Sequence, residues 1–350
     1  MSQFLLQAPG SQNTGAGTWY DIRFSGQPVE TNTYRFDGID GGAVISSVPG
    51  NVGGEVTSVF KLQASIENVQ EFRVESSAYP AEFGTGAGGQ VSIITKSGSN
   101  NVRGSAFEYV RNDKFDAPNY FDTYAGLPKS LLHLNQFGGS VGGPVAPNKA
   151  FFFGSYEGYR QKAGTNIVEA VPSAAAWARA VPAIAALRPG FLAPGAVTLP
   201  GKSTNPDLDI AQFQTPDEVR EDAFSGRLDV KVNDRWSSYF RVFHDQGTSD
   251  QAQSVSGRYV HTTDNPTNAV FSLLGVLSNS MTNDFKVGYN GAPTRYAGQA
   301  QNVNGIDFTP IFISLSGTAD YAATIDEGRV AWAWTERPPA NFASEPGSNM

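Results

Sequence analysis

Two glycine-rich segments match the letters of nucleotide-binding and hydrolase motifs. GTGAGG (84–89) fits G-x-G-x-x-G, but a dinucleotide site needs a helix after the glycines, and the strand-like QVSIITK (90–96) follows instead. GGSVG (138–142) fits G-x-S-x-G with Ser140 in the nucleophile position, but prolines follow almost at once and exclude the helix that a nucleophile elbow requires. We therefore predict that the chain is not an enzyme and binds no cofactor.

Residues that commonly bind metal ions are few and scattered. The three histidines, at positions 133, 244 and 261, lie far apart and have no carboxylate at metal-ligand spacing. Asp37 and Asp40 are candidate calcium ligands, but no twelve-residue loop ending in glutamate follows them, so turn aspartates are the better interpretation. The absence of cysteine excludes thiolate ligands and nucleophiles. No metal site is predicted.

The composition is typical of a protein built from strands and turns. The 350 residues include 38 glycines, 23 phenylalanines and 13 tyrosines, whereas only 17% are charged. The net charge of −8, without any run of basic residues, argues against a nucleic-acid partner. The most apolar stretch, about 167–187, is interrupted by two prolines and Arg179, so no transmembrane helix is predicted.

Alternating segments near ten residues long begin at about residue 102. In AFSGRLDVKVN (223–233), apolar residues occupy one face, while Arg227, Asp229 and Lys231 share the other. In RWSSYFRVFHDQ (235–246), Arg241 likewise lies opposite the apolar face. An arginine or lysine facing lipid in mid-membrane costs roughly 2–4 kcal/mol, so in a membrane barrel these four charged residues must face the lumen.

The connections between these segments are of two kinds. An ordinary half-buried sheet also alternates, so the alternation alone does not distinguish a soluble sheet from a membrane barrel. The expected short connections are 145–150, 233–234 and 281–283, and the expected long ones are about 112–130, 163–218 and 247–268. Short turns on one side and long loops on the other favour an outer-membrane barrel, with the long loop at about 163–218 facing the outside of the cell.

A longer segment, IENVQEFRVESSAYPAEFGTGAGGQVSIITKSGSN (66–100), resembles the end of the plug domain of TonB-dependent outer-membrane receptors. The residues that carry this resemblance are Ile66, Glu67, Glu71, Val74, Glu82, Phe83, Gly84, Gly88, Gly89, Thr95 and Lys96. Three further blocks, 31–40, 102–122 and 134–161, resemble a plug strand and the first barrel strands of the Oar-like branch of that family.

The resemblance implies a fold and a division of the chain. We expect a mainly β protein, a partial antiparallel outer-membrane β-barrel that forms an open, curved sheet with a small plug-domain remnant. Residues 1–98 would be the C-terminal part of the plug, and residues 99–350 the N-terminal part of the barrel. The start of the chain lacks the features of a signal peptide, and the end lacks an aromatic-terminated last strand, so we expect a fragment of a longer protein.

The same resemblance implies a function in the outer membrane of a Gram-negative cell. We expect part of a TonB-dependent receptor that takes up a scarce solute with energy from the TonB complex of the inner membrane. Its expected partners are outer-membrane lipid, the TonB complex and a transported ligand that the sequence does not identify. The alternative is a surface, adhesion or secretion-linked barrel protein that transports nothing.

Overall fold

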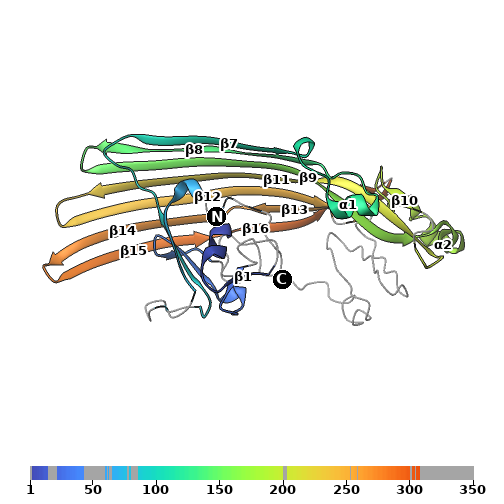
Figure 1. The fold of residues 1–350 in the computed structure, drawn as a ribbon, viewed down its shortest axis with the longest axis horizontal. Helices are drawn as coiled ribbons and strands as arrows, with labels where there is room; N and C mark the ends of the chain where they lie inside the picture. Colours follow the sequence, from blue (N-terminus) through green and yellow to red (C-terminus); the bar gives the residue numbers. More distant parts are fainter. Residues whose placement is uncertain are drawn as a thin grey trace.

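The computed structural model describes most of the first three hundred residues. The described residues are 2–14, 22–42, 60, 62, 65–76, 79, 86–199, 203–252, 254–257, 259–299, 302–303 and 305–307. They form one large antiparallel sheet, here called the wall, and a smaller N-terminal unit that lies against one of its faces (Figure 1). This N-terminal unit, residues 2–95, is called the inner unit below.

The wall follows the chain as an antiparallel meander, in which tight turns and longer connections alternate between neighbouring strands. Its main path, from one edge to the other, is β15-β14-β12-β11-β9-β8-β7. The strands of this path are β7 (Arg103–Asn112), β8 (Leu132–Ala146), β9 (Ala150–Pro172), β11 (Leu208–Lys231), β12 (Trp236–Ala252), β14 (Thr267–Ser278) and β15 (Met281–Gly291). Beyond this path, β10 (Val197–Leu199) pairs with β11, β13 (Tyr259–Asp264) pairs with β12, and β16 (Thr294–Gln299) pairs with β13. The expected open antiparallel sheet is confirmed.

Tight turns gather at one end of the wall, at the left of Figure 1. The β8–β9 turn contains Asn148 at φ 61°, a left-handed conformation that asparagine tolerates well. At the β11–β12 turn, the Asn233 side chain accepts hydrogen bonds from the backbone of Arg235 and Trp236. These two short connections lie where they were expected. The third lies at 279–280, two residues earlier than expected, because Met281 already pairs with Ser278.

The expected long loop at 163–218 is shorter than the sequence suggested. Strand β9 continues to Pro172 and β11 begins at Leu208, so the connection covers only 173–207. Pro216 lies in β11 between the part that pairs with β10 and the part that pairs with β12, so one side of the strand has no described partner there, and proline is tolerated at such an edge position. The 247–268 connection shortens likewise, because β12 continues to Ala252 and β13 begins at Tyr259.

Short α-helices occur, among the residues that the structure describes, only in the connections between wall strands. They are α1 (Tyr120–Ala125), α2 (Ala174–Arg179) and α3 (Pro182–Ala185). Ser173 accepts a hydrogen bond from Ala176 N and so caps α2. None of the helices among the described residues is long and apolar enough to cross a membrane.

The inner unit is a four-stranded sheet with a hairpin beside it. The sheet order is β4-β3-β6-β5, with the parallel pair β3–β6 at its centre. Its strands are β3 (Thr33–Phe36), β4 (Ile39–Asp40), β5 (Val69–Glu75) and β6 (Gln90–Thr95), and the hairpin consists of β1 (Ser11–Asn13) and β2 (Ile22–Phe24). The core consists of Leu5, Ile22, Phe24, Tyr34, Val91 and Ile93. Two further short strands are β17 (Asn302–Val303) and β18 (Ile306–Asp307).

The two faces of the wall differ in chemistry. Successive strand residues point to opposite faces, and the face against the inner unit, the inner face, carries Arg227 and Arg241. The opposite outer face exposes the apolar side chains of Phe224, Leu228, Val232, Phe240, Phe271, Phe285, Val287 and Tyr289. On β11 this apolar run ends at Phe224. The next residue on the outer face, Asp222, is charged and pairs with Arg160 of β9. At about 3.3 Å per residue, residues 224–232 span roughly 26 Å, close to the height of a membrane band.

Candidate functional site at the interface between the inner unit and the wall

A single carboxylate of the inner unit, that of Asp37, lies at the centre of the contact with the wall. Asp37 and Gly38 form the tight β3–β4 turn, in which both residues have positive φ values (52° and 87°). The Asp37 carboxylate accepts hydrogen bonds from Thr95 N (2.9 Å) and Thr95 Oγ1 (2.8 Å) on β6. Its interpretation as a turn aspartate is therefore correct but incomplete, because the same side chain also points into the wall.

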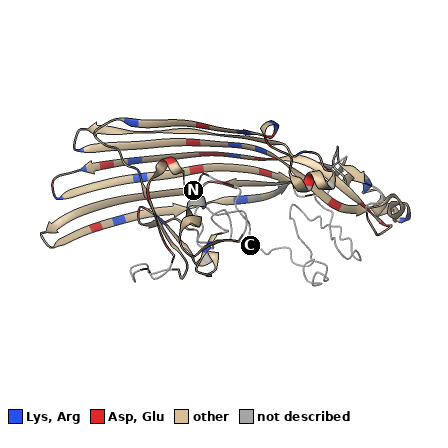
Figure 2. Ribbon diagram, in the orientation of Figure 1, with Lys and Arg blue, Asp and Glu red and all other residues tan. Residues whose placement is uncertain are grey.

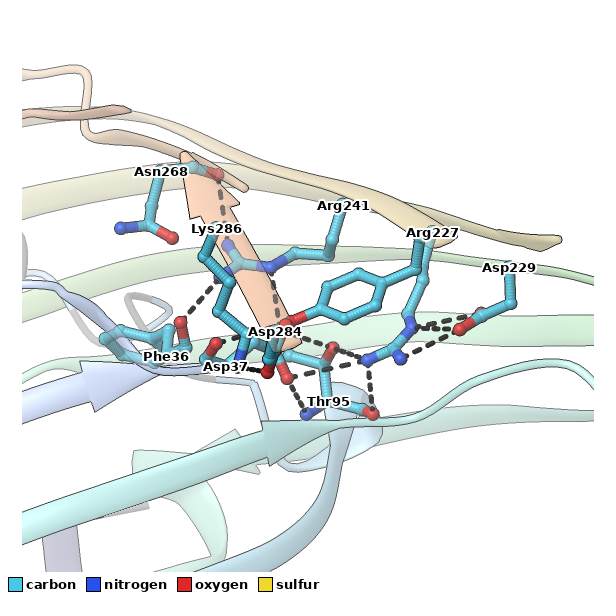
Figure 3. A network of polar contacts seen from close by, with 10 residues as sticks. Phe36, Asp37, Thr95, Arg227, Asp229, Arg241, Asn268, Asp284 and Lys286 are labelled. Atoms are coloured by element: carbon cyan, nitrogen blue, oxygen red, sulfur yellow. Dashed lines mark hydrogen bonds and ion pairs between the residues drawn. The ribbon is translucent and has the colours of Figure 1, made fainter. Parts of the chain in front are cut away.

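Two arginines of the wall share this carboxylate. Arg227 of β11 and Arg241 of β12 are direct cross-strand partners, an arrangement in which like charges repel. Arg241 Nε lies 3.0 Å from Asp37 Oδ2, and Arg227 Nη1 lies 3.5 Å from Asp37 Oδ1 (Figure 3). All three side chains are nearly removed from solvent. Asp37 therefore reduces the repulsion between two wall strands while it attaches the inner unit to both.

The remaining donors of the two arginines are also satisfied. Arg227 forms hydrogen bonds with Asp229 and with the Thr95 carbonyl oxygen, and its guanidinium lies 4.2 Å from the centre of the Tyr239 ring. Arg241 donates to the carbonyl oxygens of Asn268 (3.0 Å) and Phe36 (3.2 Å). A buried ionic group is stable only when such partners are complete. Asp37, Thr95, Arg227, Asp229, Tyr239 and Arg241 are called the Asp37 cluster below.

A second group of contacts joins the inner unit to the first wall strands. Glu67 Oε2 accepts hydrogen bonds from Ser105 Oγ of β7 (2.6 Å) and from Ser140 Oγ of β8 (3.1 Å). The neighbouring Asn68 side chain accepts a hydrogen bond from Ser155 of β9. Ser140, the residue that matched a hydrolase pattern, therefore lies in a flat strand as one of these hydroxyl donors.

Glycine permits the close approach of the chain to the wall next to these contacts. A side chain on Gly98 would place its Cβ 2.2 Å from the Phe152 carbonyl oxygen of β9. Within the inner unit, Gly89 packs under the Phe24 ring, and Gly88 lies against the Asn32 side chain, leaving no space for a Cβ at either position. Close packing thus explains the glycines of the 88–98 segment without a phosphate-binding loop.

The other motif residues fall in several places. Thr95 belongs to the Asp37 cluster, and Lys96 Nζ lies 4.0 Å from Glu67 Oε2. Glu71 and Val74 lie in β5 at the edge of the inner sheet, and Ile66 is exposed. The motif residues Glu82, Phe83 and Gly84 lie outside the described residues.

The four charged residues expected in the lumen do not have equal roles. Arg227, Asp229 and Arg241 lie on the inner face in the Asp37 cluster, whereas Lys231 is at the turn end, half exposed and paired with Asp234 (2.9 Å). The sequence does not reveal that Asp37 pairs with Arg227, because 190 positions separate them. The sequence offered only a weak signal for a shared acidic partner: two arginines lie on the charged faces of successive strands of a hairpin.

A small cavity of about 30 Å³ lies beside the Asp37 cluster, between the inner unit and the wall. Its lining includes Arg241, Asn68, Ser225, Asn268 and Asn290. The Asn268 side-chain oxygen has no hydrogen-bond partner, and the space is sufficient for one or two water molecules. Among the described residues, no group of three histidine or acidic side chains has the arrangement of a metal site.

Comparison with known proteins identifies the family that this architecture defines. The model of the outer membrane beta barrel domain family matches residues 94–186 and 179–326, together well over half of the chain. The chain belongs to this family, and the protein resides in the outer membrane of a Gram-negative cell.

Individual relatives agree with this assignment and with the resemblance found in the sequence. The chain is 28% identical over 153 residues to the TonB-dependent transporter Oar of Myxococcus xanthus, which corresponds to 43% of this chain and 13% of that protein. It superposes on the siderophore receptor PirA of Acinetobacter baumannii with a TM-score of 0.51 and 18% identity, over 92% of this chain and 40% of that one. The similarity to TonB-dependent receptors, with Oar among them, is thus confirmed, and the chain spans less than half the length of these relatives.

Proposed function

We propose that the chain supplies the plug and the first wall strands of an energised outer-membrane importer for a scarce solute. The residue boundary between these two parts would lie near 98–99, in the connection between β6 and β7. The proposed partners are outer-membrane lipid on the outer face, the TonB complex and a solute that passes between the inner unit and the wall. No catalytic chemistry is part of this proposal.

The observation that carries the proposal is the set of polar contacts between the inner unit and the wall. Asp37, Arg227 and Arg241 are joined by ion pairs, and Glu67 and Asn68 meet serine hydroxyls. When such an interface opens, water can solvate the separated charges and hydroxyls, whereas an opened apolar core would have no such compensation. An inner unit held in this way can be displaced and returned without unfolding. A purely adhesive barrel has no use for that property.

A reversible tether between the inner unit and the wall tests this proposal. Asn68→Cys with Ser155→Cys places two thiols where the side chains now form a hydrogen bond, and the chain has no other cysteine. Cells that express the full-length protein are grown under nutrient limitation, and solute loss from the medium is followed by mass spectrometry. At least one solute should be depleted by wild-type cells and by reduced double-cysteine cells, but not by oxidised ones.

Controls separate the tether from oxidation and show whether energy is required. The single variant Ser155→Cys should be unaffected by the oxidant, and a proton-motive-force uncoupler should stop depletion by wild-type cells. If oxidation changes no solute and the uncoupler has no effect, the protein is not an energised importer. The surface or adhesion role then becomes the better assignment.

A further inference from the structure

A row of basic and hydroxyl side chains crosses the outer face of the wall just beyond its apolar band. On β11 this row follows Phe224 and Asp222, at the next outward-facing position. Direct cross-strand partners share a face, so the pairing of five strands defines the row. Its members are Arg160 of β9, Arg220 of β11, Thr248 of β12, Thr263 of β13 and Arg295 of β16, called the arginine row below.

The arginine row lies at the depth of lipid headgroups. Tyr156 of β9 marks the boundary, because its ring packs against Phe224 in the apolar band while its hydroxyl donates to Asp222 (2.6 Å) beyond it. Arg220 is four residues past Phe224, which in a strand tilted by about 35–45° corresponds to roughly 10 Å along the membrane normal. The headgroup region is about 5–8 Å thick, and an arginine side chain is long enough to reach back into it.

The positive charge at the centre of this row is only partly balanced by acidic neighbours. Arg160 and Arg220 are direct cross-strand partners, an arrangement in which like charges repel. Arg160 Nη2 donates to both carboxylate oxygens of Asp222 (2.7 and 2.8 Å). Arg220 Nη2 lies 3.8 Å from the Glu218 carboxylate, which is also paired with Lys162 of β9 (2.5 Å). Two carboxylates thus serve three cations.

The two cations that share Glu218 are also the more accessible ones. The side chains of Arg220 and Lys162 are 63% and 50% exposed, whereas that of Arg160 is held against the wall by Asp222. Other charged side chains on this face either form histidine–aspartate pairs or lie three strands away: His133 with Asp113, His261 with Asp250, and Glu108 of β7. Arg220 and Lys162 can therefore accept a further anion without breaking a buried contact.

We propose that Arg220 and Lys162 bind the phosphate group of a lipid headgroup in the outer leaflet of the membrane. The inference rests on the orientation in the proposed function, in which the long connections face the outside of the cell. A guanidinium and an ammonium group both bind phosphate oxygens well, and the Thr248 hydroxyl beside Arg220 is a further donor. The negative charge of the phosphate would also reduce the repulsion between Arg220 and Arg160.

The apolar band below the arginine row favours a lipid over a free anion. Phe224 is 50% exposed and lies on the same face of the same strand as Arg220. A lipid whose phosphate lies between Arg220 and Lys162 can therefore place its acyl chains against the band, where they lose no contact with apolar surroundings. A soluble anion would gain the same ion pairs but not this apolar contact.

The test measures lipid binding by the purified full-length protein in a neutral detergent. Diphosphorylated lipid A, a glycolipid with two phosphate groups, is titrated in, and the bound fraction is followed by native mass spectrometry. Arg220→Gln and Lys162→Gln should each weaken binding roughly fivefold, the loss expected for one cation beside an anionic headgroup. Arg179→Gln is the matched control and should bind as the wild type does, because it removes a similarly exposed cation, paired with Asp207, from the 173–207 connection.

Two further ligands separate phosphate recognition from other causes. Dephosphorylated lipid A should bind weakly, and equally to the wild type and to the Arg220→Gln/Lys162→Gln double variant. Equal affinity of these two proteins for the diphosphorylated lipid overturns the proposal, and so does a loss of affinity that the dephosphorylated lipid shares. Full displacement of the lipid by inorganic phosphate also overturns it, since the residues would then bind a free anion. No result depends on solute uptake, so the lipid site and the importer function can fail separately.

Discussion

At the scale of single residues, one aspartate accounts for much of the attachment between the two parts of the molecule. The Asp37 carboxylate accepts from Thr95 inside the inner unit and pairs with Arg227 and Arg241 of the wall. Because the two arginines are cross-strand neighbours, loss of this charge would leave Arg241 buried without its carboxylate beside Arg227, which keeps Asp229 as its partner. Asp37 thus stabilises both the interface and the wall hairpin beneath it.

Replacement of this carboxylate should release the inner unit. Asp37→Asn should weaken the attachment by about 3–5 kcal/mol, the usual effect of breaking a buried ion pair. The measurement is the urea concentration at which a protease begins to cleave the inner unit of the purified full-length protein. Asp40→Asn is the matched control, since Asp40 lies in the same hairpin and its carboxylate is bonded to Gly42 N. Equal cleavage profiles for the two variants would show that the cluster does not hold the inner unit.

The residue scale is also where the sequence predicted least. The charged faces of 223–233 and 235–246 predicted that Arg227, Asp229 and Arg241 share one side of the sheet, and in the structure these residues lie at the contact with the inner unit. Their partner Asp37 could not be identified, because it is distant in the chain and its neighbours describe an ordinary turn.

At the scale of elements, the alternation of side chains predicted the strands, and their limits were less certain. Alternation follows from the two-residue repeat of a strand and needs no long-range information. The extent of β9 and β11 beyond the apolar band was not predicted, because the outward residues there are polar and prolines occur nearby. Hydrogen bonding between these long strands, which the sequence does not show, keeps the segments extended.

The glycines of these elements allow a test of the packing. Gly98→Ala should displace the connection between β6 and β7, because the new Cβ would lie 2.2 Å from the Phe152 carbonyl oxygen. Overpacking of this kind costs about 1–3 kcal/mol. Gly154→Ala in β9 is the matched control, since its Cβ would meet no described atom closer than 3.8 Å. Thermal unfolding of the purified protein should show a lower transition temperature only for the first variant, and equal transitions would contradict this contact.

At the scale of the whole molecule, the charges and the apolar side chains are distributed unequally between the two faces of the wall. Charged residues lie on several wall strands (Figure 2), and those that meet the inner unit are enclosed on the inner face. On the outer face, Leu228, Phe240 and Phe285 are exposed although they are apolar. Such a surface is stable only against lipid, which agrees with the family assignment.

The orientation of β11 and β12 in the membrane tests the central claim most directly. An environment-sensitive fluorophore is attached to single cysteines that replace Leu228 or Phe240 on the outer face, and Asp229 or Ser237 on the inner face. The full-length protein is reconstituted in bilayers that contain a quencher on the lipid chains. Quenching should be strong at 228 and 240 and weak at 229 and 237, because neighbouring residues in a membrane strand face lipid and lumen in turn. Equal quenching at all four positions, or the reverse order, would contradict the assignment of this sheet as the wall of an outer-membrane barrel.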